Sequence, residues 1–260
     1  MALSMDKDVA AKFEEFKKTV ASAGEKIVFR VFPSKILELQ SLIDGAEQSD
    51  SPFHASNALK HTDTNIYPPP SAASDNSEHQ AKKRKREDAA EPTPAANGLA
   101  SHANEPARCI YPNLIKSNKN MTQLHDIIRR ESQELATNVD KTKLWVNLIM
   151  PRIEDGDNFG VQIQEEVLTE LHRAQESAYS LRDAVRADHL TRAKICSKLI
   201  KYPHLEDYAL ALQDHDEKQH FLAKQHLTDI RNLYAILTDL IHKNITKIRA
   251  PKANNAANLY

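Results

Sequence analysis

The sequence predicts an all-α fold: an elongated antiparallel four-helix bundle with one disordered insert between its first and second helices. Three observations favour this class. Aromatic residues make up only 6% of the 260 residues and glycines number only five, which argues against a sheet with many tight turns. Apolar residues recur at spacings of three and four along several long segments. A single stretch, residues 44–116, breaks this pattern and contains eight of the twelve prolines.

The first bundle helix is predicted in residues 1–43. Its apolar stripe consists of Val9, Phe13, Phe16, Val20, Ile27, Val31, Ile36, Leu39 and Ile43. The insert that follows, residues 44–116, is rich in Pro, Ser, Ala, Asn and Glu and has few large aliphatic side chains. It cannot bury enough apolar surface to offset the loss of chain entropy, so we expect it to be disordered or loosely held.

Helices two to four are predicted in residues 117–251. The second runs from about Ser117 to Ile149. Its residues in near-heptad register are Leu124, Ile128, Glu131, Leu135, Val139, Thr142, Val146 and Ile149. The third follows residues 151–161 and ends at Pro203, and the fourth begins near His204 and ends at Pro251, because proline cannot continue a helix. Each rod would span roughly 45 to 65 Å, and rods of this kind pack as a bundle.

Composition and motifs exclude several classes of function. The net charge of −1 gives no basic field for nucleic acid, and no run approaches the ~20 apolar residues of a membrane span, so we expect neither partner. Cys109 and Cys196 form no CxxC, which fits a reducing compartment. Nucleotide-binding and catalytic motifs are absent, and His215 and His220 are five residues apart rather than four. The sequence therefore predicts a binding or structural protein with no cofactor, no metal and no active site.

The connection between helices two and three, PRIEDGDNFGV at residues 151–161, is unusually elaborate. It holds two of the five glycines and three carboxylates. Counted from Asp155 as the first position of a calcium loop, Asp157, Gly160 and Glu166 fall at positions three, six and twelve, as an EF-hand requires. Phe159 occupies the fifth position, where it cannot serve as a ligand. A calcium site stays an alternative, and the phenylalanine and glycine need another explanation.

Several further motifs supply that explanation. PRIEDGDNFGV is followed in order by QIQEE, TRAK (191–194), KYPHLEDY (201–208), DEKQHF, IRNLYAIL, HKNITKIRAPK and a terminal NLY. Together they resemble the eleven-S, or REG-type, proteasome activators, and among these the gamma type. The resemblance runs from about residue 117 to residue 260. FPSKILEL (32–39) fits the family's first helix, and the insert corresponds to its variable segment.

The resemblance implies a fold and a mechanism. Family members are non-enzymatic, ATP-independent activators whose four-helix subunits form a seven-membered ring on an end of the core proteasome. Their activation loop contacts the gating tails of the proteasome α subunits and holds the gate open. The matching residues here are Arg152, Ile153, Glu154, Asp155, Gly156, Asp157, Asn158, Phe159 and Gly160.

Within this loop, Gly156 and Gly160 are expected to adopt backbone angles that other residues resist, and Phe159 to anchor the loop on its own bundle. Asp157 departs from the family, which has asparagine there, so the strength of activation is an open question. The resemblance also assigns a proteasome-binding tail, residues 252–260. Its last three residues, Asn258, Leu259 and Tyr260, would enter pockets between α subunits.

Two lysine-containing features complete the expectations. The basic run in the insert fits a nuclear import signal, a nucleic-acid patch or a solvated charge cluster, and the gamma-type resemblance favours import, with a nuclear and also cytoplasmic location. Its residues are Lys82, Lys83, Arg84, Lys85 and Arg86. Lys194 matches a lysine that the gamma type carries on its channel-side helix. The alternative function is a nuclear helical scaffold that does not open the gate.

Overall fold

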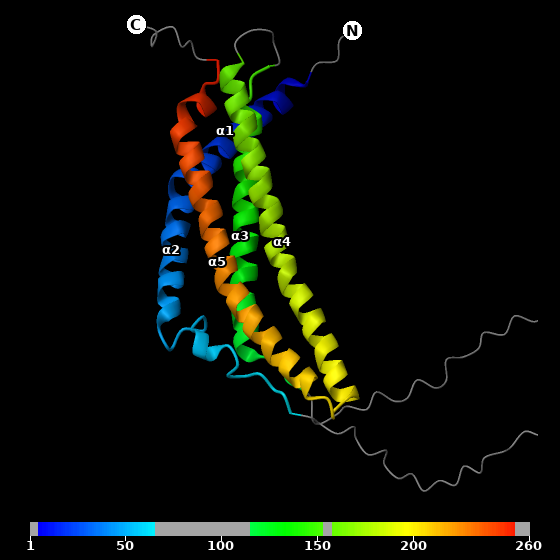
Figure 1. The fold of residues 1–260 in the computed structure, drawn as a ribbon. Coiled ribbons are helices and arrows are strands. Elements are labelled where there is room, and N and C mark those ends of the chain that lie inside the picture. The colour runs from blue at the N-terminus through cyan, green and yellow to red at the C-terminus, as the bar shows by residue number, and fades with distance from the viewer. Residues whose placement is uncertain (1–4, 66–114, 153–157, 253–260) are drawn as a thin grey trace, which may run out of the picture.

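The computed structural model describes residues 5–65, 115–152 and 158–252, and these form a bundle of long helices (Figure 1). No strand occurs within these three ranges. The main helices are α1 (Lys7–Lys26), α2 (Phe32–Asp44), α3 (Lys119–Ile149), α4 (Phe159–Lys201) and α5 (Glu206–Arg249). A π-helical turn, η1 (Ile27–Val31), joins α1 to α2, so the first rod is continuous. The all-α class and the four-rod count are therefore confirmed.

Successive rods run in opposite directions (Figure 1). α3 rises from the insert to the 151–158 connection, α4 returns, and α5 rises again, so that its C-terminal end lies near the start of α4. We call this end of the bundle the loop end. The opposite end, where α3 begins and α4 passes into α5, is the insert end. α4 has 43 residues and α5 has 44, which corresponds to rods of about 65 Å.

The first rod is bent rather than straight, which differs from the expected helix over residues 1–43. α2 lies along α5, whereas α1 turns away and packs on α3 (Figure 1). Pro33 lacks the N–H that would continue the regular hydrogen bonding, and the π-helical turn stands directly before it. Because the first half of α1 is largely exposed to solvent, Val9, Phe13 and Phe16 are exposed. Only the later residues of the predicted apolar stripe lie in the core.

The core follows the predicted heptad of α3 closely. Leu124, Ile128, Leu135, Val139 and Val146 are all at most 1% exposed. Two polar residues in the same register, Glu131 and Thr142, are fully buried as well. The predicted core face of this helix is therefore confirmed, polar positions included.

A buried ion cluster explains why the core admits Glu131. The Nζ atom of Lys35 on α2 lies 2.8 Å from Oε2 of Glu131 and 2.8 Å from Oε2 of Glu134, and both glutamates are on α3. Burial alone would lower the pKa of Lys35, but hydrogen bonds to Glu131, Glu134 and Glu38 raise it on balance, so the lysine stays charged. A buried carboxylate is tolerated because a charged partner satisfies it.

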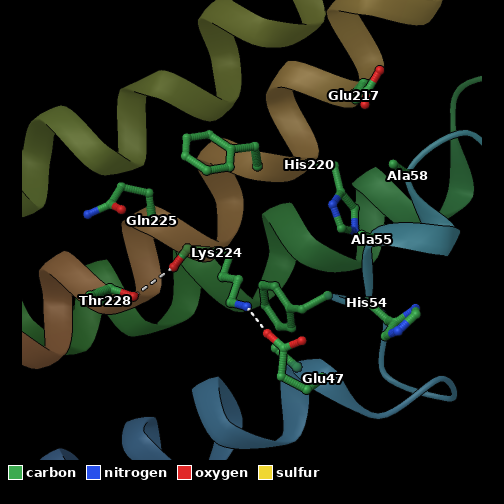
Figure 2. Close-up of a pocket in the computed structure, with 12 residues that line it drawn as sticks. Glu47, His54, Ala55, Ala58, Glu217, His220, Lys224, Gln225 and Thr228 are labelled. Carbon is green, nitrogen blue, oxygen red and sulfur yellow. Dashed lines mark hydrogen bonds and ion pairs between the residues drawn. The ribbon is translucent and has the colours of Figure 1, made fainter.

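The first part of the predicted insert, residues 45–65, is structured. Residues 45–65 form two 3₁₀ turns, η2 (Gly45–Glu47) and η3 (Ala55–Asn57), which cover α5 (Figure 2). Phe53 is only 3% exposed. Lys224 lies 2.5 Å from Glu47, and the His220 ring is hydrogen-bonded to the Pro52 carbonyl at 3.0 Å. A few well-placed apolar side chains hold this segment, although its average composition resembles that of the rest of the insert.

No helix in the described ranges is both long enough and apolar enough to cross a membrane.

Candidate functional site

The candidate site lies at the loop end, where the 151–161 connection and the start of the tail meet. α3 ends at Ile149, and α4 begins at Phe159 directly after Asn158. Arg152, Asn158, Phe159 and Gly160 are the described members of the predicted activation loop. The other predicted members, Ile153, Glu154, Asp155, Gly156 and Asp157, lie outside the described residues. The geometry of the site therefore comes from the two bases of the loop and from the end of α5.

Gly160 brings the two segments into close contact. A Cβ atom placed on this glycine would lie 2.2 Å from the carbonyl oxygen of Pro251 and 2.6 Å from its Cα. Both atoms belong to backbone, so they could not move aside as a flexible side chain could. Gly160 is buried in the first turn of α4 and has helical geometry, so the expected need for an unusual backbone angle is wrong. The glycine is required for space.

Two hydrogen bonds connect the same segments. The Gln164 side-chain amide donates to the Ile248 carbonyl at 2.8 Å, and both residues are fully buried. This bond satisfies a carbonyl in the last turn of α5, which the helix itself leaves without a partner. Lys252 donates from Nζ to the Arg152 carbonyl at 3.4 Å. The bases of the loop and of the tail are thus joined at three points.

Phe159 lies in a different position from the one expected. Its side chain is 57% exposed at the first position of α4, so Phe159 is not a core residue of this chain. The Asn158 side chain makes no capping hydrogen bond to the helix. Large exposed aromatic rings are typical of contact surfaces. A partly exposed apolar ring therefore stands beside the loop.

The insert end has the opposite character, with charged side chains buried between helices. The Arg192 guanidinium of α4 lies 2.9 Å from Oδ1 of Asp216 on α5. Thr62 and Asn118 also donate to Asp216, at 2.8 and 3.3 Å. Burial alone would lower the pKa of Arg192, but hydrogen bonding and the charge of Asp216 raise it on balance. This cluster lies where residues 58–65 pack against the start of α3.

The remaining predicted site residues have these positions. Lys194 is exposed on α4, and its carbonyl accepts a hydrogen bond from the Ser197 hydroxyl at 2.8 Å. The tail residues Asn258, Leu259 and Tyr260 lie outside the described residues, as does the basic cluster, Lys82, Lys83, Arg84, Lys85 and Arg86. Sequence reasoning missed the partnership of Gly160 and Gln164 with the end of α5, because no spacing rule connects positions so far apart.

Comparison with known proteins gives a consistent result along the chain. The family description "Proteasome activator PA28, C-terminal" matches residues 114–258, and "Proteasome activator PA28, N-terminal" matches residues 7–49. The chain is 34% identical over 264 residues to "Proteasome activator complex subunit 3" of Gallus gallus and of Homo sapiens, which covers 99% of this chain and 98% of each relative. The resemblance drawn from the motifs is confirmed.

Solved structures agree with the fold. The 11S subunit of the Plasmodium falciparum proteasome, PA28, superposes with a TM-score of 0.70 at 28% identity and covers 97% of this chain and 98% of that one. The activator PA26 of Trypanosoma brucei, in a crystal structure with the yeast 20S proteasome, superposes with a TM-score of 0.54 at 12% identity, covering 96% of this chain and 100% of that one. At that identity the similarity establishes the fold alone.

Proposed function

Because this chain belongs to the PA28 family of proteasome activators, we propose that it is a non-enzymatic, ATP-independent cap that opens the gate of the core proteasome. The observation that supports the proposal is the close contact of Gly160 with Pro251, which brings the base of the predicted activation loop next to the base of the predicted tail. A gate opener needs both segments on the same face, since one must bind while the other displaces the gate.

The mechanism divides the work between the two segments. The tail residues, Asn258, Leu259 and Tyr260, bind between proteasome α subunits, and the loop residues 151–161 contact the gating tails. Rigid bases reduce the entropy that the loop loses on contact. The three contacts among Gly160, Gln164, Lys252 and the backbone of the neighbouring segment provide such bases. The exposed ring of Phe159 adds apolar area beside the loop.

Assembly strengthens the binding. In a seven-membered homo-oligomeric ring, seven weak tails act together, because binding of the first raises the effective concentration of the others. Exposed Lys194 on α4 is assigned to the channel, where several copies would disfavour basic peptides. The basic cluster, residues 82–86, is assigned to nuclear import.

The test is hydrolysis of a short fluorogenic peptide by latent core proteasome without ATP. We expect a several-fold increase on addition of the full chain. A chain lacking Leu259 and Tyr260 should give no increase and should no longer sediment with proteasomes, while its helical circular dichroism stays unchanged. Stimulation that needs ATP, or full stimulation by the truncated chain, would contradict the mechanism. Absence of any binding by the intact chain would favour the scaffold alternative.

A further inference from the structure

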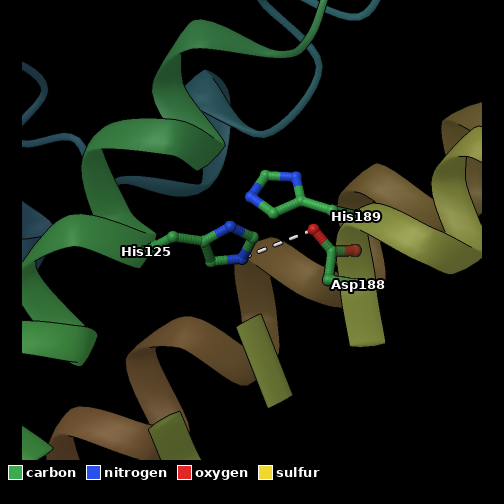
Figure 3. A group of neighbouring side chains, drawn as sticks. All are labelled: His125, Asp188 and His189. Atoms are coloured by element: carbon green, nitrogen blue, oxygen red, sulfur yellow. Dashed lines mark ion pairs between the residues drawn. The ribbon is translucent and has the colours of Figure 1, made fainter. Parts of the chain in front are cut away.

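A group of imidazole and carboxylate side chains lies between α3 and α4 near the insert end, far from the candidate proteasome-contacting end. His125 comes from α3, and Asp188 and His189 are neighbours on α4 (Figure 3). One ligand atom from each residue can be chosen so that all three lie within 4.8 Å of one another. Neither the fold nor the proposed gate opening requires this arrangement.

The spacing of the first two ligands fits a metal site. Nε2 of His125 lies 3.5 Å from Oδ2 of Asp188. This separation is too long for a strong hydrogen bond. Two ligands bound at about 2.0 to 2.1 Å to a tetrahedral ion stand about 3.4 Å apart. The pair is therefore spaced as ligands of one ion would be.

A second observation is independent of the spacing. His125 is only 4% exposed, yet its Nδ1 atom has no hydrogen-bond partner among the described residues. Buried imidazoles normally have their ring nitrogens satisfied, since an orphaned polar atom is costly. The His125 ring is therefore held by no hydrogen bond from a described residue at Nδ1, while its Nε2 atom faces Asp188.

The carboxylate is held in place from its other side. Nε2 of His215, on α5, lies 2.6 Å from Oδ1 of Asp188, which leaves Oδ2 directed at His125. Partners of this kind orient the ligands of metal sites. His189 is exposed, so an ion could reach the group from solvent. His215 would then connect α5 to the site through its hydrogen bond with Asp188.

We propose that His125, Asp188 and His189 form a site for a divalent transition metal, with zinc as the best match and a fourth position open to solvent. Two imidazoles and one carboxylate are a typical zinc ligand set. The two imidazole nitrogens disfavour calcium and magnesium, which prefer oxygen ligands. The site would clamp α3 to α4 at the insert end.

The test uses the full chain after treatment with a chelator. Zinc chloride titrated in a calorimeter should bind at one equivalent per chain, and cobalt chloride should give the visible absorption of a tetrahedral ion. His189→Ala should weaken zinc binding at least tenfold, and it should fold normally because His189 is exposed. His172→Ala, an exposed position on the same helix outside the group, is the matched control and should bind zinc unchanged.

A second readout separates this site from adventitious binding. Saturating zinc should raise the Tm of the wild-type chain and of His172→Ala by several degrees, because the ion binds the folded state, and should leave His189→Ala unchanged. No zinc binding by the wild-type chain, or equal affinity and equal Tm shift in His189→Ala, would overturn the proposal.

Discussion

The loop end and the insert end are held together by different kinds of contact. At the loop end, the backbone of α4 at Gly160 rests on the backbone of Pro251, and the Gln164 side chain reaches the last turn of α5. At the insert end, the ion pair of Arg192 with Asp216 is buried among hydrogen-bonding side chains. The loop end depends on the close approach of two backbone segments, whereas the insert end depends on a buried charge that is paired within the core.

The difference matches what each end has to do. Backbone contacts hold two segments closely in position, because neither side can rotate away as a side chain could. Buried charges instead penalise wrong arrangements strongly, since each unpaired charge would be costly. The loop end therefore sets a geometry for contact, and the insert end holds residues 58–65 against the start of α3.

The largest expected effect is on stability, at the insert end. Asp216→Asn removes the charge that pairs with Arg192 and leaves a buried guanidinium uncompensated, which should cost about 3–5 kcal/mol of unfolding free energy. Urea unfolding measures the loss. Asp214→Asn, an exposed neighbour on α5, is the control and should change stability little. A loss below about 1 kcal/mol would mean that the pair is not the main support of this end.

Gly160→Ala should damage the loop end. The added Cβ would overlap the Pro251 backbone, so the loop or the tail must shift, at a cost of about 1–3 kcal/mol. Stimulation of proteasomal peptide hydrolysis should fall far more than stability does. Gly45→Ala is the control, because a Cβ at Gly45 meets nothing within 4 Å. Full stimulation by Gly160→Ala would show that the exact fit of the two segments is unimportant.

Gln164→Leu should have a smaller effect at the same end. It removes one buried hydrogen bond to the Ile248 carbonyl, which is worth about 1 kcal/mol. Thermal unfolding detects this loss, and Gln162→Leu, an exposed position two residues earlier, should show none. Equal Tm values for the two variants would remove Gln164 from the account of the loop end.

The smallest effect is a pH dependence that belongs to neither end. Burial lowers the pKa of His226 on α5, against an opposite effect of the Asp229 charge. The unfolded chain, with a histidine pKa near about 6.5, then binds the proton more readily than the folded chain. The neutral His226 side chain therefore contributes stability above the pKa of the unfolded chain, and this contribution is lost as the pH falls. The stability of His226→Gln, measured by urea unfolding between pH 5 and 7, should fall less on acidification than that of the wild-type chain, and an identical slope would contradict the assignment.

Sequence patterns predicted the straight parts of the fold well. The helices α3, α4 and α5 each end shortly before a proline, as the sequence predicted. The heptad of α3 identified core positions, including Glu131 and Thr142. These features are local, so a single segment contains the information. The bend at η1 was not predicted, because a proline near the start of a helix is compatible with either a straight or a bent rod. Exposure of Val9, Phe13 and Phe16 follows from that bend.

The candidate site could be predicted only in part. Motif order gave the segments, but the role of Gly160 depends on where Pro251 lies, and no pattern along the chain encodes that. The group of His125, Asp188 and His189 could not be predicted from the sequence for the same reason. His125 is distant in sequence from the other two residues, and adjacent residues on a helix do not face each other. Phe159 resembled a core residue by type alone, and type does not decide exposure at a helix start.

The most direct test of the central claim, that the loop end is the end that contacts the proteasome, is electron microscopy of this protein bound to the core proteasome. We predict that residues 151–161 and the tail after Pro251 face the α subunits, with the insert end and its Arg192–Asp216 pair pointing away. A complex in which the insert end contacts the α subunits, with the loop end facing solvent, would contradict the account.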